Sequence, residues 1–277
     1  LGGTFNTAAL GNFSRLGGVV NITGALDNTG STLLLDSGKG VFNLTGGTIT
    51  GGTVDAEGTG SLAISSGTLN GVTLAAGDYS VGTASTSASL TVTNGLTLNS
   101  GATLTYNLAS FQGNDIVFNT GTLGGAGTLV LNPSSSASMS LAANSGQTLT
   151  IGSGVTIKTA ATAGNGASIT SNGTGTVTNQ GTISSETAGR TLTINPTTST
   201  NTGTYAAKNG GIWHMKRLWT LAQAAGMRIY PGNHPSLSVA TAGTIHLAAA
   251  WAGPLCEGPF AYGISGDLAD DFVTEPL

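Results

Sequence analysis

Short segments that alternate apolar and polar residues recur through residues 1–207, and their spacing constrains the fold more than any other feature. Examples are residues 20–23, 41–45, 61–65 and 148–151, each followed by glycine within two positions. Period-two alternation over four or five residues, bounded by turn formers, is typical of β-strands. The apolar spacing of an amphipathic helix is missing from this part of the sequence, and its glycines disfavour helices.

Similar segments return at a nearly constant step along the chain. A period near twenty made of short strands indicates a solenoid in which each turn of chain stacks on the last. Residues 1–207 then give about ten coils, with insertions or shortened coils expected between Leu69 and Leu129. Three series of apolar residues follow this step: Ile49 and Leu69; Ile22, Leu44 and Ile64; and Leu129, Leu149 and Ile169.

The sequence predicts a mainly β protein: a parallel, right-handed β-helix over residues 1–207, followed by a small α/β remnant over residues 208–277. Leucine, isoleucine and valine are expected to point inward and form stacked columns, with threonine, serine and asparagine facing water. Glycine and asparagine supply the left-handed backbone angles that the corners need.

Composition excludes several other classes of protein. The 45 glycines have no three-residue period and only 7 prolines accompany them, so collagen is excluded. A charged content of 7% and a hydrophobic content of 39% argue against disorder. The net charge of −4, with scattered basic residues, argues against nucleic-acid binding. The single Cys256 forms no internal disulfide, and no apolar run is long enough to span a bilayer. The missing initiator Met and signal peptide suggest a fragment.

Residues 1–207 resemble the β-helical stalks of bacterial exported adhesins, namely autotransporter passengers and filamentous-haemagglutinin-like repeats. The resemblance is carried by residues 28–33, 44–49, 179–183 and 201–205. It implies a secreted or cell-surface bacterial protein that adheres to its surroundings or holds another part outward. The implied partners are glycans or proteins of a host surface or matrix, or neighbouring cells.

The composition changes abruptly after residue 212. All three tryptophans, all three histidines and the only cysteine lie beyond that point. Apolar residues at helical spacing predict helices over 212–225 and 236–251, and strands are predicted over 227–230 and 255–257. This alternation indicates an α/β piece, so we expect two unrelated domains, residues 1–207 and 208–277, joined near Lys208.

Residues 208–277 resemble the end of the catalytic barrel of the enolase superfamily, in its muconate-cycloisomerase and mandelate-racemase branch. The matching segments are residues 207–212, 221–226, 246–250 and 270–277. The resemblance implies a cytoplasmic, Mg²⁺-dependent parent enzyme in which Glu257 and His234 are the candidate catalytic residues. Tyr205 stands where that family has its catalytic lysine, and residues 1–207 supply neither metal ligands nor a base. We therefore expect a chimera with an inactive tail, no bound cofactor, and a tail that caps the β-helix or stays poorly ordered.

Three functions remain open from the sequence. The first is a structural or adhesive surface module, and the second is a lyase or isomerase fragment of the enolase type. The third is a polysaccharide-active β-helix, because Asp36 and Asp55 are nearly one coil apart in sequence and Glu57 shares a strand face with Asp55. Paired carboxylates at short range can cleave glycosidic bonds, whereas scattered acids on a solvated face do no chemistry.

Overall fold

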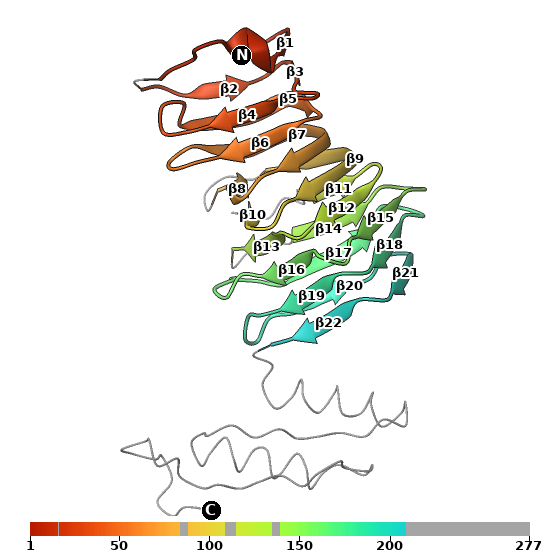
Figure 1. The fold of residues 1–277 in the computed structure, drawn as a ribbon. Coiled ribbons are helices and arrows are strands. Elements are labelled where there is room, and N and C mark those ends of the chain that lie inside the picture. Colours follow the sequence, from red (N-terminus) through yellow and green to blue (C-terminus); the bar gives the residue numbers. More distant parts are fainter. Residues whose placement is uncertain (16, 84–87, 109–114, 135–138, 209–277) are drawn as a thin grey trace, which may run out of the picture. The chain divides into compact units, whose positions relative to one another are not determined.

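The computed structural model describes residues 1–15, 17–83, 88–108, 115–134 and 139–208. These residues form a parallel β-solenoid of about eight turns, in which strands stack in sequence order from the red to the blue end of the ribbon (Figure 1). All the strand pairings among them are parallel. Because the pairs join strands of successive turns, the mainly β, parallel solenoid predicted for this part is confirmed. The predicted α/β remnant, residues 208–277, lies outside the described residues apart from Lys208.

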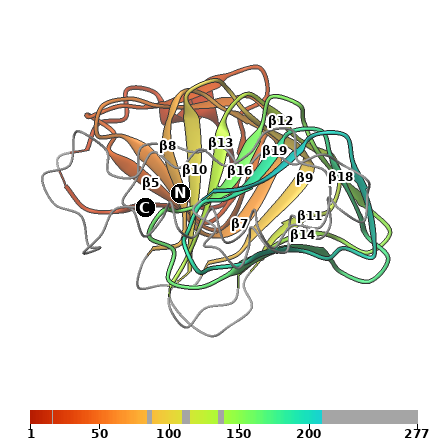
Figure 2. The same ribbon diagram turned by 90° about the horizontal axis from the view of Figure 1, so that it is seen from below.

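Each turn contributes strands to three faces that surround a common interior (Figure 2). Face 1 contains β2 (Val20–Ile22), the start of β5 (Val41–Thr50), the start of β7 (Ser61–Leu74), β8 (Gly77–Val81), β10 (Ala102–Leu108), β13 (Thr128–Pro133), β16 (Thr156–Thr159), β19 (Thr182–Ser185) and β22 (Thr204–Ala207).

Face 2 follows face 1 along the chain. It contains β1 (Thr4–Asn6), β3 (Ala25–Asp27), the end of β5, the middle of β7, the start of β9 (Leu90–Leu98), β11 (Asp115–Phe118), β14 (Met139–Ala143), β17 (Ala167–Ser171) and β20 (Leu192–Ile194). The one short helix among the described residues, η1 (Thr7–Leu10), follows β1.

Face 3 completes each turn. It contains β4 (Thr32–Leu35), β6 (Thr53–Ala56), the end of β7, the end of β9, β12 (Thr122–Gly125), β15 (Thr148–Ile151), β18 (Thr176–Asn179) and β21 (Thr198–Asn201). The long strands β5 and β7 bend at register shifts where they pass from one face to the next.

The core consists of inward columns of aliphatic and aromatic side chains. On face 1 the column Ile22, Leu44, Ile64, Val81, Tyr106 and Leu131 is 0–1% exposed throughout. Since alternate residues point to opposite sides of a strand, the small polar residues between them face outward. Burial therefore continues from coil to coil along the axis, as the sequence predicts, and apolar burial is the main stabilising contribution.

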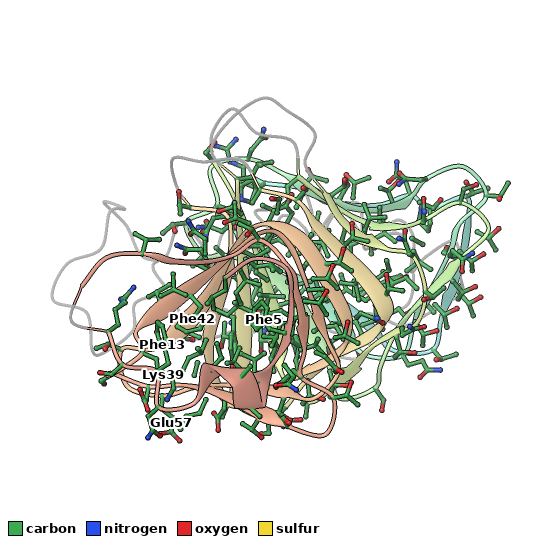
Figure 3. All side chains as sticks on the ribbon, turned by 90° about the horizontal axis from the view of Figure 1, so that it is seen from above. Phe5, Phe13, Lys39, Phe42 and Glu57 are labelled. Carbon is green, nitrogen blue, oxygen red and sulfur yellow. The ribbon has the colours of Figure 1, made fainter. Side chains whose placement is uncertain are left out.

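The N-terminal end of the solenoid is covered by aromatic side chains. Phe13 lies edge-on against Phe42, with ring centroids 5.6 Å apart, and Phe5 and Leu10 pack against the same core. Figure 3 shows Phe5, Phe13 and Phe42 gathered over the interior at this end. The Arg15 guanidinium donates to the Gly18 carbonyl at 2.8 Å, which holds the loop before β2. These contacts remove the first coil's inward face from water.

The predicted period near twenty holds for the first coils and returns in the last one, where Thr176 pairs with Thr198. Hydrogen bonds between stacked side chains span 22 residues from Asn21 to Asn43 but 25 from Asn107 to Asn132. The expected column through Leu129, Leu149 and Ile169 is wrong: Leu129 stacks on Ile157, Leu149 on Val177, and Leu141 on Ile169.

The cause of that error is the length of the corners. Longer corners enlarge the coils in between to as many as 28 residues, so a step of twenty reaches a different face. The number of coils is accordingly about eight instead of ten. The expected irregularity between Leu69 and Leu129 is confirmed, because the step from Ser61 to Asp78 is only 17 residues and the step from Gly82 to Asn107 is 25.

Candidate functional surface

The two residues carried over from the enolase resemblance, His234 and Glu257, lie outside the described residues. So do the predicted helices and strands of the tail and Cys256. The Mg²⁺ that the resemblance implies stays an expectation from sequence. Among the described residues, no three His, Cys, Asp or Glu side chains gather closely enough to hold a metal ion.

Asp36 and Asp55 are not stacked on each other, contrary to the interpretation of their spacing in the sequence. The register pairs Asp55 with Leu34 and Ala56 with Leu35. Asp36 comes two residues after Leu34, just beyond the end of β4, so it does not lie beside Asp55. Asp55 faces outward on β6, and Glu57 is exposed just after that strand. Figure 3 shows Glu57 and Lys39 on the outside of the first coils.

The Asp36 carboxylate belongs to the turn that follows β4. It accepts backbone hydrogen bonds from Gly38 at 3.0 Å and Lys39 at 2.9 Å, and pairs with the Lys39 ammonium at 3.1 Å. These interactions, led by the hydrogen bond from the Lys39 side chain, lower the pKa of Asp36. A carboxylate held ionised in a turn is a poor proton donor, so the arrangement gives Asp36 a structural role.

A second ionic group joins the last described coils. The Glu186 carboxylate lies 2.9 Å from the Lys208 ammonium and 4.0 Å from that of Lys158, and it accepts a hydrogen bond from Ser184 at 3.2 Å. The hydrogen bond from Lys208 is the largest cause of the lowered pKa of Glu186. This cluster ties together residues near β16, β19 and β22. Sequence alone does not reveal this cluster, because the stacking that unites the three residues depends on coil length.

Rows of threonine side chains run along face 3 of the later coils. The register stacks Thr148, Thr176 and Thr198 in one row, and Thr122, Thr150, Thr178 and Thr200 in the next. None of these hydroxyls has a hydrogen-bond partner among the described residues. Both rows therefore present ordered hydroxyl and methyl groups to solvent, at the spacing of roughly 4.7–4.9 Å between neighbouring strands.

Asparagine side chains form hydrogen-bonded ladders between coils. The pairs Asn70–Asn94, Asn107–Asn132 and Asn119–Asn144 are each 2.8 Å apart, and the pair Asn179–Asn201 is 2.7 Å apart. An asparagine amide carries both donor and acceptor atoms, so each one can bind the coil above and the coil below. The ladders fix the register of corners and strand edges.

Two hollows lie on the surface of the described residues. One, of about 320 Å³, is lined by residues from the turns and strands of three successive coils: Gly71, Val72, Asn94, Gly95, Leu96, Thr97, Gly121, Thr122 and Gly124. The other, of about 240 Å³, lies beside β14, β17 and β20. Sequence reasoning missed both, although the Asn94–Gly95 and Gly121 turn signals mark where the first one occurs.

The fold and surface define a parallel β-solenoid whose outer faces carry hydroxyl and amide groups. Comparison with protein-family models, curated proteins and solved structures finds no match to this sequence. Within the part of the chain that the structure describes, no helix has the length and apolar character needed to cross a membrane.

Proposed function

We propose that the solenoid is a structural and adhesive segment of an exported bacterial protein, exposed at the cell surface or secreted. The observation that carries this proposal is the pair of features just described: a continuous solenoid, and rows of exposed hydroxyl and amide side chains that repeat on successive coils. A repeated surface offers many equivalent weak contacts at once, and linked contacts raise the overall affinity without any single strong site.

The rigidity of the scaffold supports the same proposal. Each coil contacts only its neighbours, so the solenoid can be extended or shortened without a change of fold. The inward columns are almost fully buried, which keeps the outward rows in fixed register. Such a segment can hold a distant part of the same protein away from a surface while its own faces contact glycans or proteins of a host, a matrix or a neighbouring cell.

Attachment measurements with the whole chain test the proposal. Beads coated with the protein are expected to attach to cultured epithelial cells or matrix-coated surfaces, and attachment is expected to decrease when whole coils are removed. Beads coated to the same density with an unrelated β-rich protein are the control. Attachment equal to that control, at every surface tested, would contradict an adhesive role.

A further inference from the structure

The larger hollow lies where three coils present glycine in place of larger side chains. Gly71 lies within β7, Gly95 within β9 and Gly124 within β12, and Gly121 immediately precedes β12. Its volume of about 320 Å³ is within the roughly 300–1,000 Å³ of small-ligand sites. Glycine allows a ligand to approach the backbone closely, so the hollow has a floor of main chain.

The backbone at this place departs from the regular stacking. The pairing of β7 with β9 shifts register between Asn70 and Val72. Asn94 has a φ of 57°, the only positive φ of a non-glycine residue among those described. Bulges and left-handed residues redirect side chains and are frequent next to binding sites. Here the shift opens the space between the strand ends.

Three polar side chains surround the hollow. The Asn94 amide donates to the Asn70 side chain at 2.8 Å, and the Asn94 backbone N–H donates to the Thr120 hydroxyl at 2.9 Å, so Asn94 is held in place. The hydroxyls of Thr97 and Thr122 have no hydrogen-bond partner among the described residues. No charged residue lines the hollow in the part of the chain that the structure describes. A ligand here meets fixed hydrogen-bonding groups without a net charge.

We propose that this hollow binds one unit of an uncharged, linear polysaccharide, whose further units lie along the threonine rows of face 3. The proposal rests on the adhesive function above and names its ligand class. Neighbouring coils are roughly 4.7–4.9 Å apart, close to the length of one pyranose unit. Thr122, which lines the hollow, begins the row that continues through Thr150 and Thr178. A chain that runs along the axis therefore meets one hydroxyl for each sugar unit.

Gly124 offers a substitution that fills the hollow without strain. Its φ is not in the left-handed region, and an added Cβ would meet only the Thr122 methyl and the Thr97 hydroxyl, both at 3.9 Å. Gly124→Tyr is thus expected to fold and to occupy the site. Gly17→Tyr is the matched control, because Gly17 also lacks a left-handed φ, has no atom within 4 Å of an added Cβ, and lies far from β12 in the stack.

Binding of the full chain to an array of immobilised linear oligosaccharides, uncharged and sulfated, tests the proposal. Wild type and Gly17→Tyr are expected to retain uncharged oligosaccharides, and Gly124→Tyr is expected to lose them while keeping the far-ultraviolet circular dichroism of a β protein. Retention of sulfated oligosaccharides alone, or equal retention by Gly124→Tyr, would overturn the proposal.

A second pair of variants keeps the test decisive if Gly124→Tyr does not fold. Thr97→Val together with Thr122→Val removes both hydroxyls at nearly constant shape and is expected to weaken retention. Thr103→Val with Thr128→Val makes the same change on face 1 and is expected to leave it intact. Cell attachment by the same beads separates the two proposals, because attachment without any retention of uncharged oligosaccharides contradicts only the glycan site.

Discussion

Tyr79 illustrates how a single polar group is accommodated in the interior. Its side chain is 2% exposed, and its single hydroxyl proton lies within reach of two carbonyl acceptors, Val54 at 2.9 Å and Ala75 at 3.1 Å. The residue lies in β8, where the coil is shortest. A buried phenol there fills the interior and also binds the preceding corner, because its ring is apolar and its oxygen is not.

Tyr79→Phe removes that hydroxyl and keeps the ring. We expect the free energy of unfolding to decrease by about 0.5–1.5 kcal/mol, the usual net contribution of one hydrogen bond. Urea unfolding followed by circular dichroism measures the change. An unchanged midpoint would show that the hydroxyl contributes nothing to stability.

The same residue predicts a loss of stability at alkaline pH. Burial, the largest cause, raises the pKa of Tyr79 from 10.0 to about 12. The unfolded chain therefore releases this proton at lower pH than the folded chain, so its contribution is complete below pH 10 and is lost as the pH rises towards 12. Across that range wild type is expected to lose more stability than Tyr79→Phe. Parallel slopes for the two proteins would exclude this explanation.

The lowered pKa of Glu186 predicts a smaller loss of stability in acid. Its pKa is lowered in the folded chain by Lys208 and Lys158, so its contribution is present above the ordinary value of 4.5 and is lost as the pH falls through the lowered pKa. Lys208 is well exposed, and solvent screening limits the contribution to about 1 kcal/mol or less. Glu186→Gln is expected to lower stability at pH 7 by that amount, and 1 M NaCl to reduce the difference. A difference that persists in high salt would indicate a role other than charge pairing.

At the scale of the element, corners decide which strands stack. The corner between β5 and β6 contains Gly52, with a φ of 64°, and an added Cβ would overlap the Asn28 carbonyl oxygen. Gly30 has a similar φ of 66° but no atom within 4 Å of an added Cβ. Both glycines need the left-handed region, and only Gly52 is also pressed against the previous coil.

Substitution of these two glycines by alanine separates the two costs. Gly30→Ala is expected to cost about 1–2 kcal/mol, from backbone strain alone. Gly52→Ala is expected to cost clearly more, because Asn28 is fully buried and its coil must move. Thermal unfolding of both variants measures the difference, and equal losses would show that close approach between coils is unimportant at this corner.

The length of the corners also decides how much of the fold the sequence could predict. Alternation is local, so the strands around residues 20, 41, 61 and 148 are where the pattern placed them. The stacking of Ile22, Leu44 and Ile64 was also predictable, because the first corners are short and nearly equal in length. The stacking of Leu129 on Ile157 was not, since corner length leaves no mark on side-chain alternation and loop closure costs little per added residue.

The candidate surface was harder to predict for a related reason. The hollow exists because Gly71, Gly95 and Gly124 come from different coils and lie together only in the correct register. If the stacking is assigned one face out of step, the three glycines no longer lie together. The predicted pairing of carboxylates was wrong for the same reason. Asp36 and Asp55 are nearly one period apart in sequence, but the register does not stack them.

At the scale of the whole molecule, the solenoid is a one-dimensional stack whose repeat is set by structure and not by a constant number of residues. Thr148 is stacked directly on Thr176, and Leu149 on Val177. Residues 148–175 therefore form one complete turn through β15, β16 and β17. Without them, β12 would pair with β18, β13 with β19, and β14 with β20. Each of these pairs joins two strands of the same face.

Deletion of residues 148–175 is accordingly expected to leave a folded solenoid with one turn fewer. Deletion of residues 148–167, which follows the shorter period read from the sequence, removes β15, β16 and the start of β17 and joins Gln147 to Ser168, so a segment of face 2 falls where face 3 should continue. Ile169 then takes the inward place of Leu149, but each later strand meets a strand of another face across a corner of a different length. Nearest-neighbour stacking predicts a modest loss of unfolding free energy for the first deletion and a collapse of cooperative unfolding for the second. Circular dichroism during urea unfolding distinguishes them, and equal tolerance of both deletions would mean that the coils are not held in fixed register.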